Sequence, residues 1–153
     1  MNNTTENPRM LLNRIDKELD GLCHDYASSH GISDVTLFIL YVLCDNGEGC
    51  TQSDICGLWS YPRQTVNSSL KKLERDGYLR LSPVSGSRKN KGIFFTDSGR
   101  RLAERIAAPV IAAEDAVFDA MNEEELSLLI SLTQKRNLLL RRELEKRNKE
   151  KQL

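Results

Sequence analysis

Side chains suited to reading nucleic acid bases gather on one face of a helix predicted over residues 62–76. Val66, Leu70 and Leu73 recur at the spacing of a buried helical stripe, so the opposite face is polar. Arginine can grip guanine, and glutamine or asparagine can grip adenine. Lysines farther along the helix suit phosphates, which position a protein without reading sequence. The alternative is an ordinary solvated face. The outer residues are Arg63, Gln64, Thr65, Asn67, Ser68, Lys71 and Lys72.

A second basic cluster lies in the predicted turn of a hairpin, at residues 85–92, which read SGSRKNKG. Residues 78–84 and 92–96 are the predicted strands. Like charges crowded on a short turn repel one another unless an anion approaches, so a phosphate or minor-groove contact is predicted. A merely soluble loop is the alternative. The basic residues of this turn are Arg88, Lys89 and Lys91.

The elements around these two clusters form a recognisable outline. Thr51 and Asp54 have the spacing of a capping box and predict a short helix ahead of the helix at 62–76. Pro62 is expected in the first turn of that second helix, where its missing N–H costs nothing, and Gly77 ends the helix. Two short helices followed by a basic hairpin outline a winged helix-turn-helix, which places one helix in a DNA groove.

Four further helices are predicted on either side of this motif. Apolar residues spaced three and four apart predict a helix from Arg9 to the pair His30-Gly31. Another is expected over 34–45, although its β-branched and aromatic residues leave a buried strand open. A long helix over 97–120 contains Pro109, which should kink or divide it. Asn122 and Glu125 form a capping pair that opens the last helix.

Charge is distributed unevenly along the chain, although the formal net charge is zero. Residues 60–105 hold 11 Lys and Arg against 4 Asp and Glu, a net charge of +7. Residues 1–50 have a net charge of −5, residues 106–133 of −6, and the tail from 134 to 153 of +5. Such separation indicates a face meant for a polyanion.

Composition and length limit the class of protein. With 153 residues, the chain can bury a core without disulfides. Its longest fully apolar run, Leu37 to Cys44, is too short to span a bilayer, and the N-terminus has no apolar signal core. A cytoplasmic location is therefore expected.

Residue patterns typical of catalytic and metal sites are absent from the sequence. The sequence has no nucleophile elbow, phosphate loop or clustered metal ligands, so neither an enzyme nor a cofactor nor a metal is predicted. His24 and His30 are read as surface or interface residues. No cysteine pair has CxxC spacing. Cys56 suits the small buried position of a helix-turn-helix, and Cys50 is the candidate for a redox-sensing thiol, which should be exposed and near positive charge.

The order of these motifs resembles the MarR family of bacterial transcriptional regulators, from about residue 9 to 147. Thr51 to Ile55 match the start of the first helix of the family's helix-turn-helix, and Arg63 to Val66 match the opening of its recognition helix. Leu73 to Leu79 resemble the exit from that helix. Phe95 to Gly99 resemble the family's Leu-Thr-x-x-Gly step out of the wing.

The resemblance implies a mainly α-helical fold with a small β-wing. The expected parts are an N-terminal dimerisation helix at 1–32, a winged helix-turn-helix at 33–99 and C-terminal dimerisation helices at 100–153. Thr51, Gln52 and Ser87 join the outer-face and turn residues as predicted DNA contacts. Ser87 and Lys89 stand where the family usually has an Asp and an Arg that brace the wing, and lysine lacks the bidentate geometry of arginine.

A homodimer on a roughly palindromic site is also implied, and the apolar stripes of the first and last helices agree with it. In the last helix the spacing alternates four and three, as in a helix packed along a partner. The predicted dimerisation residues are Leu12, Ile15, Leu19, Leu126, Ile130, Leu140 and Leu144.

The implied function is that of a sequence-specific regulator that binds double-stranded DNA, most often a repressor, released by a small-molecule effector or an oxidant. The effector crevice would lie near Tyr26, His30, Tyr41 and residues 100–112. The alternative is a winged-helix module that binds protein rather than DNA. Apolar or acidic residues on the face at 63–72 would favour that alternative, and the observed residues do not.

Overall fold

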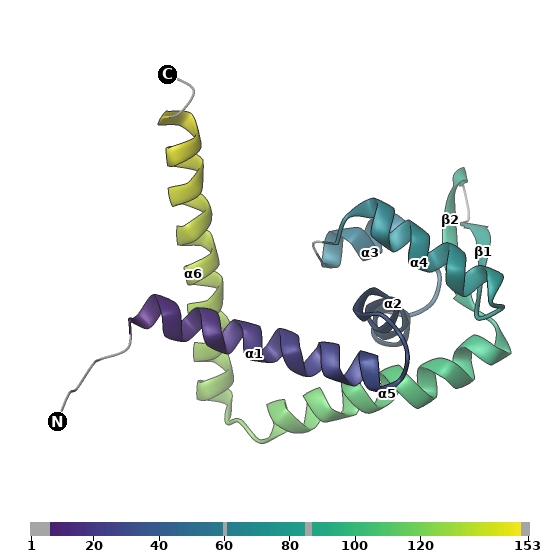
Figure 1. The fold of residues 1–153 in the computed structure, drawn as a ribbon, viewed down its shortest axis with the longest axis horizontal. Helices are drawn as coiled ribbons and strands as arrows, with labels where there is room; N and C mark the ends of the chain where they lie inside the picture. Colours follow the sequence, from purple (N-terminus) through teal and green to yellow (C-terminus); the bar gives the residue numbers. More distant parts are fainter. Residues whose placement is uncertain (1–6, 60, 85–86, 151–153) are drawn as a thin grey trace. The chain divides into compact units, whose positions relative to one another are not determined.

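The computed structural model describes residues 7–59, 61–84 and 87–150, with side chains described outside positions 84–90. Its helices and its one antiparallel hairpin confirm the predicted fold class, mainly α with a small β-wing (Figure 1). The elements are α1 (Pro8–Ser29), α2 (Asp34–Asp45), α3 (Gln52–Leu58), α4 (Arg63–Arg75), β1 (Leu79–Val84), β2 (Ser87–Phe95), α5 (Asp97–Asp119) and α6 (Glu123–Glu150).

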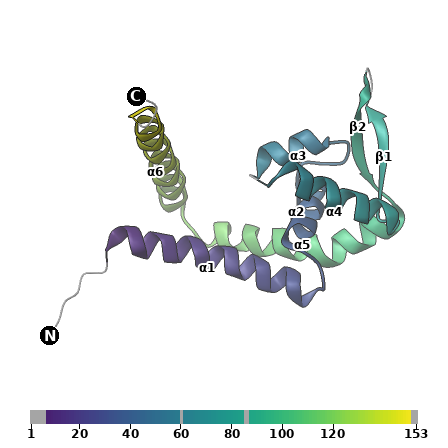
Figure 2. The same ribbon diagram turned by 45° about the horizontal axis from the view of Figure 1, so that its top comes forward.

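Helix α2 lies at the centre of the hydrophobic core. Ser33 caps it by accepting a hydrogen bond from the Thr36 N–H at 3.2 Å. Every residue from Val35 to Leu40 is buried, because α2 has neighbours on all sides. Figure 2 shows α4, the hairpin and the first part of α5 around it. All-round burial therefore accounts for the strand-like composition of this segment, and the open alternative of a strand is wrong.

The helix-turn-helix forms as predicted. Thr51 and Asp54 make a complete capping box at the start of α3, and Ile55 is fully buried beneath it. Val66, Leu70 and Leu73 are the buried residues of α4. Pro62 is the N-cap residue of α4, one position earlier than predicted.

The hairpin differs from the prediction in extent. β1 pairs with β2 from Leu79 opposite Phe95 to Val84 opposite Ser87, with an irregularity between Pro83 and Val84. The second strand thus begins at residue 87, and the prediction of a turn over 85–92 is wrong for most of it. Gly, Ser and Asn indicated a turn, but the ladder with β1 extends farther. Ser87, Arg88, Lys89 and Lys91 consequently lie on a strand.

Thr96 and Gly99 join the hairpin to α5. The Thr96 hydroxyl donates to the Gly77 carbonyl at 2.6 Å and accepts from the Gly99 N–H at 3.0 Å. A Cβ atom added at Gly99 would lie 1.8 Å from the Tyr78 carbonyl oxygen. The Thr-x-x-Gly step therefore has a steric cause, since only glycine fits so close to the preceding backbone.

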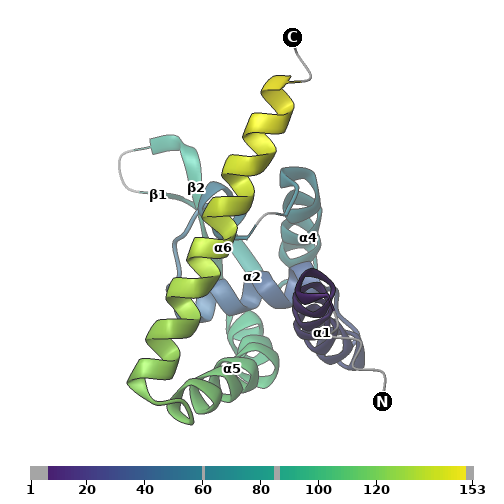
Figure 3. The same cartoon turned by 90° about the vertical axis from the view of Figure 1, so that its left-hand side faces the viewer.

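The chain divides into one compact unit up to Ile111 and another from Ala112 onward. The predicted three-part division stays a prediction. Helix α5 runs through Pro109 as one element, so this proline does not divide it. Asn122 and Glu125 cap α6 reciprocally, as predicted, and Figure 3 shows α6 as one continuous helix.

No single helix in the described ranges is long and apolar enough to cross a membrane. Helices α1 and α2 together meet the length and composition criteria but are bent by 94°.

Candidate nucleic-acid interface

The outer face of α4 carries the predicted base-reading residues. Its buried stripe turns the opposite side of the helix outward, because residues three and four apart share a face. All seven outer residues lie on the surface: Asn67 is half-buried, and Arg63, Gln64, Thr65, Ser68, Lys71 and Lys72 are exposed.

Arg63, the first residue of α4, is held by the first turn of α3. Its Nη2 donates to the Ser53 hydroxyl at 3.0 Å. Its backbone carbonyl accepts from the Gln52 side-chain amide, also at 3.0 Å. The predicted DNA contact Gln52 therefore has a partner within the protein, and Ser53 is a site residue that the sequence prediction missed.

The hairpin is fastened to the start of α3. The Gly49 N–H donates to the Ile93 carbonyl at 2.8 Å, and the Ile93 N–H donates to the Cys50 carbonyl at 2.9 Å. Thr51 also forms a bridge with Gly92, where an added Cβ would lie 2.8 Å from the Gly49 carbonyl oxygen. These contacts fix the hairpin against the residues that precede α3.

A groove of about 630 Å³ lies between α3, α4 and the hairpin. It brings together part of the predicted set, from three separate elements. Gln64, Thr65 and Ser68 lie on the exposed face of α4, and the side chains of Ser87, Arg88 and Lys89 lie outside the described residues. The predicted residues that line the groove are Thr51, Gln52, Arg63, Asn67, Lys71 and Lys91.

Two carboxylates also line this groove, and the sequence prediction gave neither a role there. Asp54 accepts from the Thr51 N–H at 2.7 Å and from its hydroxyl at 2.8 Å, and these bonds lower the pKa of Asp54 below its usual value. Glu74 follows Asn67 by seven residues and Lys71 by three, a spacing that places it on the same face. This helical spacing could have placed Glu74 in the groove from the sequence alone. Carboxylates repel a polyanion, so the lining of the groove is mixed in charge rather than uniformly basic.

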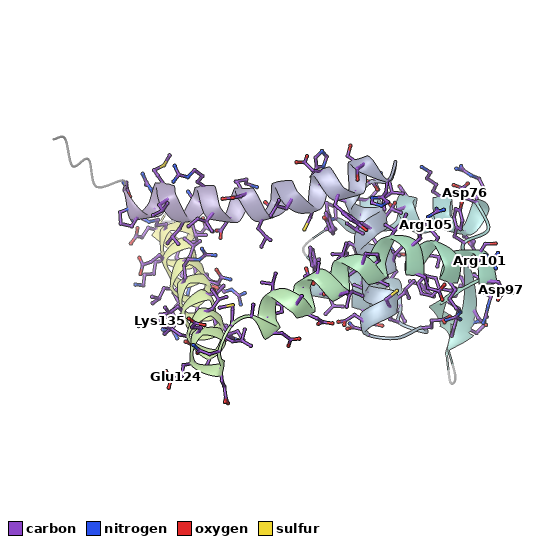
Figure 4. All side chains as sticks on the ribbon, turned by 90° about the horizontal axis from the view of Figure 1, so that it is seen from below. Asp76, Asp97, Arg101, Arg105, Glu124 and Lys135 are labelled. Carbon is purple, nitrogen blue, oxygen red and sulfur yellow. The ribbon has the colours of Figure 1, made fainter. Side chains whose placement is uncertain are left out.

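A second cavity, of about 260 Å³, lies between the α1–α2 turn, the end of α4 and α5. It brings His30 together with Leu102, Arg105 and Ile106, within the region predicted for an effector. Figure 4 shows Asp76 and Arg105 on the same side of the unit. The remaining lining residues include Thr36, Lys72, Asp76 and Tyr78.

Tyr26 and Tyr41, also predicted near the effector region, have different surroundings. The Tyr26 hydroxyl donates to the Ile106 carbonyl at 2.9 Å, and its ring lies 4.4 Å from that of His30. Tyr41 packs against the hydrophobic core. Tyr26 therefore supports one wall of the cavity, through Ile106 and His30.

The surroundings of Cys50, Cys56 and His24 do not support a reactive thiol or a metal site. Burial and the nearby Asp54 carboxylate raise the pKa of Cys50, which is the reverse of what a reactive thiol needs. Cys56, predicted at a buried position, packs against the core but is only partly buried. His24 lies 3.0 Å from an Asp34 carboxylate oxygen. Within the described ranges, no group of three or more His, Cys, Asp or Glu side chains could hold a metal ion.

The predicted dimerisation residues are exposed apolar side chains. Leu19 is 64% exposed and Ile130 is 49% exposed. Leu126 is half-buried, yet no residue of α6 is fully buried anywhere in the described length of that helix. Leu12, Ile15, Leu140 and Leu144 are the other exposed members.

Comparison with known proteins relates this arrangement to one family. A MarR family model matches residues 30–89, the core and the helix-turn-helix. The HTH-type transcriptional regulator PecS of Dickeya dadantii is 28% identical over 123 residues, which are 79% of this chain and 74% of PecS.

Solved structures share the whole fold. A MarR family regulator from Neisseria meningitidis matches with a TM-score of 0.78 and 18% identity, over 92% of this chain and 98% of that one. MepR of Staphylococcus aureus, solved in complex with DNA, matches with a TM-score of 0.69 and 22% identity, over 90% and 99% of the two chains. With its capped helix-turn-helix, anchored hairpin and flanking helices, the chain is similar in fold to these regulators, and its residues 30–89 match the MarR family model.

Proposed function

We propose that this protein is a transcriptional regulator that binds double-stranded DNA in a sequence-specific way. The observation that carries the proposal is the outer face of α4, where arginine, glutamine, asparagine and hydroxyl side chains are held outward by the buried stripe. These are the groups that read base edges in a major groove. The DNA complex of MepR, whose fold is similar, adds support.

The wing supplies the second part of the interface. Lys91 lines the same groove as Lys71 of α4, so cations of two elements lie on one side of the motif. Such cations bind phosphates and fix the register of a protein on the duplex. Arg88 and Lys89 are proposed to extend this contact along the hairpin.

The functional molecule is a homodimer that recognises a pseudo-palindromic operator. Exposed leucines and isoleucines repeated along α1 and along α6 support this proposal, because large apolar side chains exposed in number on one element mark an interaction site. Two-fold symmetry doubles the base contacts and relates half-sites about 34 Å apart along the groove.

Regulation follows from the second cavity. Lys72 belongs to α4 and Arg105 belongs to α5, and both line it together with His30. A small aromatic or anionic effector bound there would contact the recognition helix and α5 at once. We infer that such a ligand changes the spacing of the two recognition helices and releases a repressor from its promoter in the cytoplasm.

Fluorescence anisotropy across a salt series tests the proposed function. The probe is the duplex immediately upstream of the gene for this protein, and a scrambled duplex of the same composition is the control. We expect tight binding to the upstream duplex alone, weakening steeply with salt as counterions are released. Equal, weak binding to both duplexes would favour a protein-binding winged-helix module instead.

A further inference from the structure

The two hydrogen bonds between α3 and Arg63 suggest a role for residues that need not touch DNA. Arginine has a long side chain with many rotamers, and a flexible guanidinium loses conformational freedom when it binds a base. In this structure the guanidinium already has a partner, since Nη2 donates to the Ser53 hydroxyl at 3.0 Å. The backbone of the same residue is held by Gln52.

We propose that Ser53 and Gln52 are positioning residues that orient Arg63 for base recognition. The inference rests on the proposed function, DNA binding through α4. Guanidinium has five N–H donors, so one bond to Ser53 leaves enough for a bidentate contact with guanine. Gln52 places the first turn of α4, and Ser53 directs the side chain that leaves it.

Both positioning residues stand on a well-anchored turn. They are the first two residues of α3, directly after the Thr51 cap. Thr51 is held by the Asp54 carboxylate at 2.7 Å and forms a bridge with Gly92 of the wing. Thr51 thus connects the wing to the turn of α3 that holds Arg63.

Substitution of Ser53 tests the proposal with the full-length protein and the upstream duplex. Ser53→Ala removes the acceptor for Arg63, and Ser53→Thr keeps a hydroxyl. We expect Ser53→Ala to weaken specific binding about three- to ten-fold, the effect of losing one hydrogen bond. Ser53→Thr should retain the wild-type affinity. Ser98→Ala is the matched control, because Ser98 accepts from Arg101 at 3.2 Å outside the proposed interface.

The readout that separates positioning from simple stability is the base preference. Binding to duplexes with single base-pair changes should show that Ser53→Ala relaxes the preference at the base pair where Arg63→Ala relaxes it. Gln52→Ala should relax the same base pair. In an Arg63→Ala background, Ser53→Ala should cause no further loss, as expected for residues that act through one contact.

Two results would overturn the proposal. Equal loss from Ser53→Ala with and without Arg63 would mean that Ser53 binds DNA by itself. Unchanged affinity and base preference in Ser53→Ala would mean that the bond has no role in recognition. Failure of the wild-type protein to distinguish the upstream duplex from the scrambled one is a different result, since it contradicts the proposed function.

Discussion

At the scale of single residues, we propose that base recognition depends on Arg63 more than on any other side chain of α4. Arg63 is the first residue of α4 and its side chain is exposed. The other arginine of α4, Arg75, is the last residue of the helix. The later lysines are placed for phosphates. If Arg63 reads bases, its loss should affect the specific duplex more than the scrambled one. If it only contacts phosphate, its loss should affect both equally.

Arg63→Ala should weaken binding to the specific duplex by about 1–3 kcal/mol and relax its base preference, because a bidentate base contact is lost. Anisotropy with the upstream and scrambled duplexes measures both effects. Lys17→Ala is a suitable control, since it also removes one positive charge but lies on α1 beside Asp20. Equal losses on the two duplexes would show that Arg63 contacts only phosphate.

Gly99→Ala tests the steric account of the wing exit. Its methyl group would lie 1.8 Å from the Tyr78 carbonyl oxygen, so the backbone must shift. We expect the free energy of unfolding in urea to fall by about 3 kcal/mol, near the upper end of the range for overpacking. Gly57→Ala is the control, because the space around Gly57 is open. That variant should be neutral or slightly stabilised, and equal loss in both would contradict the account.

The sequence was sufficient to predict which side chains of α4 face outward. It was not sufficient to predict their hydrogen-bond partners. The period of Val66, Leu70 and Leu73 was sufficient to define the outer face. The bond from Arg63 to Ser53 depends on how two helices pack, which no local pattern encodes. Asp54 was recognised as a cap, yet its position in the groove depends on the same packing.

At the scale of elements, α3 and the residues just before it contact both α4 and the hairpin. The capping box of α3 fixes its first turn, its second residue holds Arg63, and its preceding strand-like residues pair with β2. The capping box depends on the charge of Asp54. The lowered pKa means that this carboxylate binds its proton less readily in the folded state than in the unfolded chain.

Asp54→Asn should be less stable than the wild type at pH 7 but not in acid. A lowered folded pKa adds stability above the ordinary carboxyl value of 3.8, and this stability is lost as the pH falls through the lowered value. Because Asp54 is exposed, we expect a difference of less than about 1 kcal/mol at pH 7. Urea denaturation at pH 7 and well below pH 3.8, beneath the lowered pKa of Asp54, measures it. An equal difference at both pH values would contradict the role of the charge.

The bounds of helices and strands show how far the local sequence determines structure. Helix α2 has the predicted bounds because Ser33 caps it, although its composition also suited a strand. The second strand of the wing was predicted to begin five residues too late, because its first residues are typical of turns and only pairing with β1 extends it. Caps are encoded locally, whereas strand length depends on the partner strand.

At the scale of the whole molecule, the exposed apolar residues of α6 form part of the proposed dimer interface. Ile130→Glu should convert the dimer to monomers in sedimentation velocity, because a charge cannot be buried in an apolar interface without a counterion. Lys135→Glu is the control, because a side chain five residues farther along a helix of about 3.6 residues per turn lies on another face. An unchanged dimer in Ile130→Glu would place this stripe outside the interface.

Hydroxyl-radical footprinting of the upstream duplex tests the central claim most directly, namely that a dimer reads two half-sites with α4. The account predicts two related protected half-sites, with centres about 10 base pairs or a whole multiple of one turn apart. Arg63→Ala should lose both protected half-sites at the same protein concentration. A single protected half-site, or protection by Arg63→Ala equal to that by the wild type, would contradict the account.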